Sequence, residues 1–140
     1  MTLSFYSKSN FFLLFLTLSA CSSAEQVKYE QYMIAGEQLY AKHCANCHGS
    51  QGLGLANLYP PLSKSDFLQN FNQTLCVIKN GAKGKMTVNG VEYDQIMPQN
   101  KQLYDLDIAQ IATYMYTKWG NKNDLIVAEV VKEAKCTIAQ

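Results

Sequence analysis

The chain has 140 residues, the length of one domain, and 48% of them are hydrophobic. Its 12 Lys and Arg residues against 11 Asp and Glu give a formal net charge of +1, which excludes the strongly basic surface of a nucleic-acid-binding protein. All 12 cations are lysines, so a docking surface on this chain must use lysine point charges without the bidentate geometry of arginine.

Residues 1–20 have the features of an export signal. Lys8 precedes the apolar run 11–18, which is too short to span a bilayer and suits the hydrophobic region of a signal peptide. The run ends in Leu-Ser-Ala followed by Cys21, which resembles the bacterial lipobox, where the cysteine is acylated and becomes the first mature residue. We therefore expect an exported lipoprotein, anchored by lipid on Cys21 to a membrane and facing the periplasm or the cell exterior. A plain secretory signal is the alternative.

The polar segment 21–30 shows no periodicity and is predicted to be a tether. A helix over 31–43 follows, because apolar residues recur there at helical spacing. Gly36 lowers the helix propensity of this segment; it either admits a second helix at close range or is neutral. We expect 31–121 to form the folded domain and 122–140 to form a helical C-terminal extension.

The predicted helix leads into Cys-Ala-Asn-Cys-His at 44–48, the pattern of a c-type haem attachment site. Cys44 and Cys47 share one helical turn, so each thiol can add across a porphyrin vinyl group, and the imidazole of His48 can then ligate the iron. A thioredoxin-like pair would follow a strand, whereas a helical pattern precedes this motif. A zinc site would need further ligands at short spacing, and His43 is the one other histidine; its position gives it no role. We predict one covalent haem c.

Beyond the motif, glycines and prolines predict an irregular loop, after which Ser65 with Asp66 offers a helix N-cap. A small hairpin is expected around Asn89-Gly90. Apolar periodicity and end signals predict three further helices, over 73–79, 106–119 and 127–134. Because helices and loops account for nearly the whole domain, the predicted fold class is all-α.

A haem iron has either a sixth ligand or an open position, and this choice separates an electron carrier from a haem enzyme or gas sensor. Met97 is the leading candidate, because Pro98 restrains it to an extended backbone outside any helix. Met86, on a glycine-rich stretch, is the rival. Met33 and Met115 fall on predicted helices and are expected in the core.

Two cysteines remain, Cys76 and Cys136. In an oxidising compartment an even remainder favours a disulfide, which would tie the tail to the domain. Two unbonded thiols are the alternative.

Several motifs together resemble the monohaem class I cytochromes c, and they occur in the family's order across about 31–121. Besides the haem motif they are Gly36, Tyr40, Pro60-Pro61-Leu62, Asn80-Gly81, Val88-Asn89-Gly90, Met97-Pro98 and the segment from Ile108 through Tyr114 to Asn121. The resemblance implies a few helices around one haem, with the first and last helices crossing near Gly36 and Tyr114. It also implies His48 and Met97 as axial ligands, with the carbonyl of Pro60 accepting from the protonated nitrogen of His48.

The site and the resemblance together predict a one-electron carrier that is not itself an enzyme. We expect it to move electrons between a donor and an acceptor protein of a respiratory or periplasmic chain, as a monomer or as a subunit of a respiratory complex. Two alternatives stay open. One is a haem enzyme or gas sensor with an exchangeable sixth ligand, and the other is a fixed electron-delivery subunit of an oxidoreductase complex.

Overall fold

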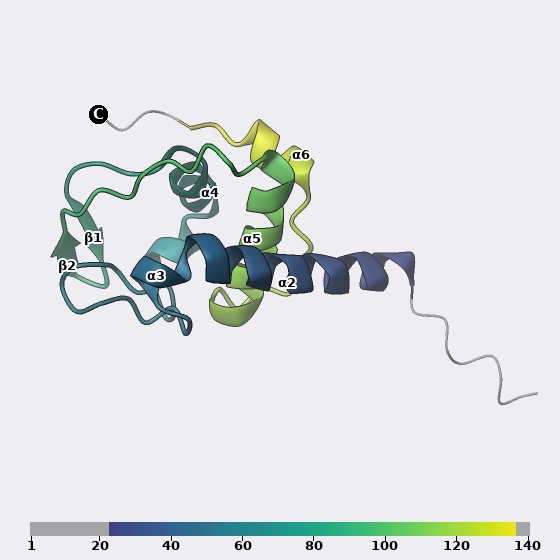
Figure 1. Cartoon of the computed structure of the whole chain (residues 1–140), viewed down its shortest axis with the longest axis horizontal. Coiled ribbons are helices and arrows are strands. Elements are labelled where there is room, and N and C mark those ends of the chain that lie inside the picture. The colour runs from purple at the N-terminus through teal and green to yellow at the C-terminus, as the bar shows by residue number, and fades with distance from the viewer. Residues whose placement is uncertain (1–22, 137–140) are drawn as a thin grey trace, which may run out of the picture.

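A computed structural model describes residues 23–136, so the predicted signal peptide, Cys21 and the last four residues lie outside the described range. The fold is mostly helical with one short hairpin, which confirms the all-α prediction (Figure 1). In chain order the elements are α2 (Ala24–His43), α3 (Ala45–His48), the 3₁₀ helix η2 (Asp66–Gln69), α4 (Phe71–Asn80), β1 (Met86–Val88), β2 (Val91–Tyr93), α5 (Asp105–Trp119) and α6 (Ala128–Glu133).

Helix α2 begins at Ala24, so most of the segment predicted as a tether is helical. The side chain of Ser23 caps the helix by accepting a backbone hydrogen bond in its first turn. Further along, the hydroxyl of Tyr29 lies 2.9 Å from Oγ1 of Thr117 on α5. The tether prediction for 21–30 is therefore wrong beyond Ser23, because capping and packing against α5 hold a helix that its own apolar pattern does not indicate.

Helices α2 and α5 cross at Gly36, and Figure 1 shows α2 passing in front of α5. A Cβ atom on Gly36 would lie 2.9 Å from Cβ of Tyr114 and closer still to the carbonyl oxygen of Gln110. The ring of Tyr40, one turn beyond Gly36, packs against Tyr114 and Trp119 with centroids 5.7 and 5.2 Å apart. The crossing near Gly36 and Tyr114 that the resemblance implied is therefore confirmed.

Helix α5 is the central helix of the core, and its residues 108–116 are almost all buried. It begins as predicted, with acidic residues in its first turn, where Asp107 Oδ2 accepts a hydrogen bond of 2.9 Å from the backbone N–H of Tyr104. Helix α6 packs on α5 and buries Val131 completely. Among residues 23–136, no helix has both the length and the apolar character needed to cross a membrane.

The hairpin forms around Asn89-Gly90 as predicted, with Met86 paired to Tyr93 across the two strands. Its turn is tied to η2 by a reciprocal pair of hydrogen bonds. The backbone N–H of Asp66 donates to Asn89 Oδ1 at 2.9 Å, and the backbone N–H of Asn89 donates to Asp66 Oδ1 at 2.8 Å. The expected side-chain N-cap at Ser65 is not formed, because the Ser65 hydroxyl accepts no backbone hydrogen bond at the start of η2.

The close approach of α2 to α5 predicts the effect of Gly36→Ala. An alanine ordinarily adds about 1 kcal/mol to helix stability over glycine, but here the added methyl meets the backbone of α5. We expect the free energy of unfolding of the haem-loaded protein to fall by about 1–3 kcal/mol in urea titrations. The exposed Gln38→Ala in the same helix is the control and should change it by less than about 0.5 kcal/mol. A stabilised Gly36→Ala variant would contradict the packing at this crossing.

Candidate functional site

The Cys-x-x-Cys-His motif lies at the junction of α2 and α3. Cys44 ends α2, with its backbone N–H donating to the carbonyl of Tyr40 at 2.9 Å, and α3 is the single turn that finishes at His48. The motif therefore forms a separate turn after α2. The hydroxyl of Tyr40 donates to the carbonyl of Gly49 at 2.7 Å, so one residue of α2 contacts both ends of this turn.

A cavity of about 330 Å³ opens beside this turn, a size typical of ligand sites. Cys44, Cys47 and His48 all line it. Most of the other lining residues are apolar and come from the loop after the motif, η2, α4, the hairpin, the segment 95–103 and α5; they include Pro60, Ile78, Val88, Tyr93, Met97 and Met115. An apolar cavity with two thiols and an imidazole on its wall fits a covalently attached haem.

His48 is oriented by a backbone carbonyl. Its Nδ1 lies 2.9 Å from the carbonyl oxygen of Pro60, the contact that the resemblance implied. Because a carbonyl can only accept, Nδ1 must carry the proton, and the lone pair is then on Nε2. Burial lowers the pKa of His48, while the bond to Pro60 partly opposes that shift. The imidazole is thus held neutral, which is the form that ligates a metal.

The Cys44 thiol of the motif is not activated. Burial, together with the neighbouring Cys47, raises the pKa of the Cys44 thiol to about 11. Reactive Cys-x-x-Cys pairs instead have a lowered pKa, so the environment does not favour a thioredoxin-like role. The described part of the chain contains two more cysteines, Cys76 and Cys136, and these form a disulfide with Cα atoms 5.3 Å apart.

Met97 and its rival Met86 both line the cavity, each half-buried. Met97 is held by two backbone hydrogen bonds to Ala82, of 2.8 and 3.0 Å, just beyond the end of α4. Met86 lies on β1, and Met115, although it also reaches the cavity, is 3% exposed within the α5 core. The structure therefore brings both candidate ligands to the cavity, with the backbone of Met97 bonded to Ala82 and that of Met86 paired with Tyr93 in the hairpin.

His43, which the sequence left without a role, also lines the cavity. Its Nδ1 lies 2.8 Å from Nδ2 of Asn100, and because an amide nitrogen donates, the ring nitrogen accepts. The contact joins the end of α2 to the loop that follows Met97. The two residues are 57 positions apart, and no local pattern indicates their contact.

Comparison with known proteins agrees with this geometry. The family described as cytochrome c oxidase, cbb3-type, subunit III matches residues 33–115, a span that contains the haem motif, Pro60 and Met97. The chain is similar to cytochrome c-552 of Thermus thermophilus, with 29% identity over 110 residues that cover 71% of this chain and 83% of that protein. It is also similar to the cytochrome c subunit of an alcohol dehydrogenase (quinone) from Gluconacetobacter polyoxogenes, with 30% identity over 103 residues that cover 71% of this chain and 22% of that protein.

Two glycines offer a matched test of the backbone that supports Met97. Gly81 and Gly84 have φ angles of +76° and +79°, so an alanine at either position carries the strain of a left-handed backbone, about 1–2 kcal/mol. A Cβ on Gly81 would also lie 2.7 Å from the backbone nitrogen of Gln99 and against the carbonyl of Met97, whereas a Cβ on Gly84 meets nothing within 4 Å. We expect Gly81→Ala to lower the free energy of unfolding by about 1–3 kcal/mol more than Gly84→Ala in denaturant titrations. Equal losses would contradict the close packing at Gly81.

Proposed function

Since the chain belongs to the class I cytochromes c, which carry covalent haem and transfer electrons, we propose that it is a one-electron carrier with His48 and Met97 as axial ligands. When bound, the haem supplies a one-electron couple. The observation that carries the proposal is that one apolar cavity brings together Cys44, Cys47, the oriented imidazole of His48 and the anchored Met97.

The residues of the cavity would have separate roles in attaching the haem, ligating its iron and setting its reduction potential. Cys44 and Cys47 would hold the porphyrin by thioethers, and His48, whose ring Pro60 orients, would offer Nε2 to the iron. The uncharged thioether of Met97 favours the reduced state more than a second imidazole would, and the apolar lining disfavours the added charge of the oxidised state. Both effects would raise the reduction potential. The sixth position, occupied by Met97, would exclude small molecules, as suits an electron carrier.

We further propose that lipid on Cys21 holds the domain at a membrane surface. The start of α2 at Ala24 supports a short linker between the lipid and the domain, because at most about 11 Å of extended chain separates the Cα atoms of Cys21 and Ala24. The polypeptide has almost no net charge, so lipid rather than basic side chains would localise it. The domain would then deliver electrons to partners close to the same membrane.

A fixed place in a larger oxidoreductase is the second candidate function. It is supported by the relative described as the cytochrome c subunit of an alcohol dehydrogenase, whose length this chain spans only in small part. Purification of the haem protein from mild detergent distinguishes the two roles. A freely exchanging carrier elutes as a monomer, whereas a fixed subunit elutes with a flavin-, quinone- or metal-containing partner.

The ligand assignment predicts different results for two methionine variants. Met97→Ala should remove the weak near-infrared band of iron–sulfur ligation and allow the reduced protein to bind carbon monoxide, because the sixth position opens. Met86→Ala, the matched control from the same cavity, should keep the band and exclude carbon monoxide. The visible and near-infrared spectra of both variants, in the oxidised and reduced states, check this. An unchanged band in Met97→Ala would assign the ligand elsewhere.

The lipid anchor predicts a specific mature terminus. Mass spectrometry of the membrane-extracted protein should find Cys21 as the first residue, carrying at least two acyl chains. When residues 1–21 are replaced by a plain secretory signal, we expect the haem protein to move to the soluble fraction with an unchanged visible spectrum. A mature terminus at another residue, or an unmodified Cys21, would refute the anchor.

A further inference from the structure

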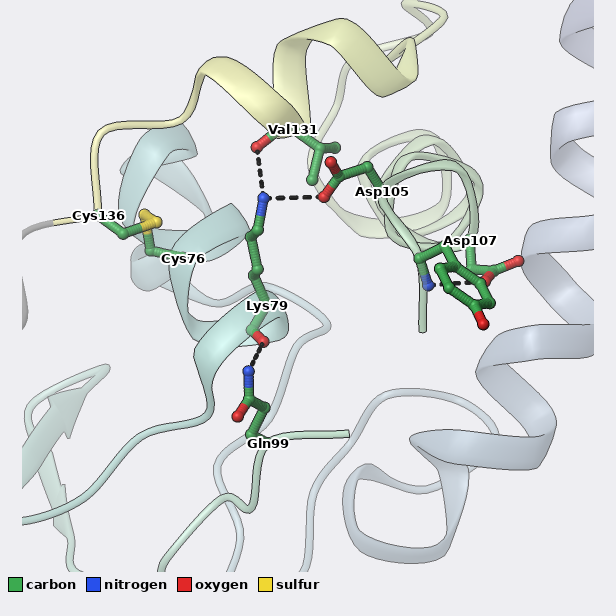
Figure 2. A network of polar contacts seen from close by, with 8 residues as sticks. Cys76, Lys79, Gln99, Asp105, Asp107, Val131 and Cys136 are labelled. Atoms are coloured by element: carbon green, nitrogen blue, oxygen red, sulfur yellow. Dashed lines mark hydrogen bonds and ion pairs between the residues drawn. A yellow bond between two sulfur atoms is a disulfide. The ribbon is translucent and has the colours of Figure 1, made fainter. Parts of the chain in front are cut away.

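The C-terminal extension is fixed to α4 at two neighbouring points. Cys136 forms the disulfide with Cys76, and Figure 2 shows this bond joining α4 to the segment after α6. One turn earlier on α4, Asn72 Nδ2 donates to the carbonyl of Lys135 at 2.9 Å, and the N–H of Lys135 donates to Asn72 Oδ1 at 3.1 Å. The tail is thus held by a covalent bond and by two hydrogen bonds between the Asn72 side chain and the backbone of Lys135.

Lys79, at the end of α4, continues this connection. Its Nζ donates to Asp105 Oδ1 at 2.8 Å and to the carbonyl of Val131 at 3.4 Å, as Figure 2 shows. Asp105 is the first residue of α5, and Val131 is the buried residue by which α6 packs on α5. One half-buried lysine therefore joins α4 to α5 and to the extension.

The same residue contacts the loop that carries Met97. The carbonyl of Lys79 accepts a hydrogen bond of 3.2 Å from Gln99 Nε2 (Figure 2). Directly after α4, Gly81 packs against the backbone of Met97 and Gln99, and Ala82 makes its two hydrogen bonds to Met97. The end of α4 is thus the support on which the backbone of Met97 rests.

We propose that the C-terminal extension is a brace that acts through the end of α4 on the Met97 loop and limits how often Met97 leaves the iron. The proposal rests on the ligation of iron by Met97 proposed above. Loops open locally with free energies well below that of global unfolding, so a brace on the supporting helix changes the population in which the ligand is detached. Cys76, Cys136 and Lys79 are positioning residues in this scheme, since their side chains act through α4 and not on the haem.

Imidazole binding to the oxidised, exported holo-protein tests the brace. Imidazole must wait for Met97 to detach, so its apparent affinity reports the detached population independently of electron-transfer activity. We expect Cys76→Ser combined with Cys136→Ser to bind imidazole about two- to tenfold more tightly, the range expected for residues coupled through one network. Lys79→Met, a milder change that leaves the disulfide in place, should act in the same direction. Both variants should keep the near-infrared band when no imidazole is present.

Two controls separate the brace from general destabilisation. Gly36→Ala weakens the α2–α5 crossing without touching α4, and Lys85→Met removes the exposed 2.8 Å ion pair with Glu92 of the hairpin. Neither should tighten imidazole binding by as much as twofold. A third variant tests the route: adding Gln99→Ala to the double-serine protein should produce less than the product of the separate effects, because both act through the end of α4.

The outcomes are distinct for each proposal. Unchanged imidazole affinity in the double-serine and Lys79→Met proteins, or an equal rise in Gly36→Ala, would overturn the brace while leaving Met97 as the ligand. If the near-infrared band survives Met97→Ala, the ligand assignment fails first, and the brace fails with it. Tighter binding confined to the brace variants, with non-additivity at Gln99, would establish the brace.

Discussion

The hydrogen bond from His48 Nδ1 to the carbonyl of Pro60 is the constraint on which the site depends. Without it, either ring nitrogen of His48 could carry the proton, and the ring could rotate. With it, the lone pair is on Nε2 and the ring plane is fixed by a loop residue rather than by the motif itself. The bond therefore links two segments, and the proposed ligation of iron by His48 would depend on the path of the loop after the motif. Burial, which lowers the pKa of His48, acts in the same direction by keeping the ring neutral.

The two longest helices fix the place of that bond. Gly36 lets α2 approach the backbone of α5, and Tyr40, one turn later, contacts both ends of the motif turn. Trp119, at the end of α5, packs against Gly52, so the same crossing also positions the loop that leads to Pro60. Packing in the core thereby fixes the backbone of the motif turn and of the loop on which the imidazole depends. Such rigidity suits a site whose task is to exchange an electron with little rearrangement.

The sequence predicted correctly the elements that are determined by neighbouring residues. It failed to predict features that are determined by contacts between residues far apart in the chain. The motif, the hairpin at Asn89-Gly90 and the helix ending before Gly120 are encoded locally, and the crossing at Gly36 followed from a family pattern. The start of α2 at Ala24 was missed because a cap and a contact to α5 decide it. The contact of His43 with Asn100 joins two segments that are far apart in the chain, and neither segment has a local sequence pattern that predicts it. Met97 as a ligand stays a prediction, because Met86 reaches the same cavity.

The extension, predicted to be helical, and the leading segment, predicted to be a tether, both pack on α5. This arrangement has a consequence for the two faces of the haem site. The motif turn is supported by α2, which is continuous with it, whereas the Met97 loop is supported by α4, a helix of 10 residues that needs neighbours to stay in place. The weaker support is the one that receives the disulfide, the Asn72 contact and the Lys79 network. Stabilising contacts are thus concentrated where local opening would otherwise be easiest, and the ligation proposed for Met97 on that loop would gain most from them.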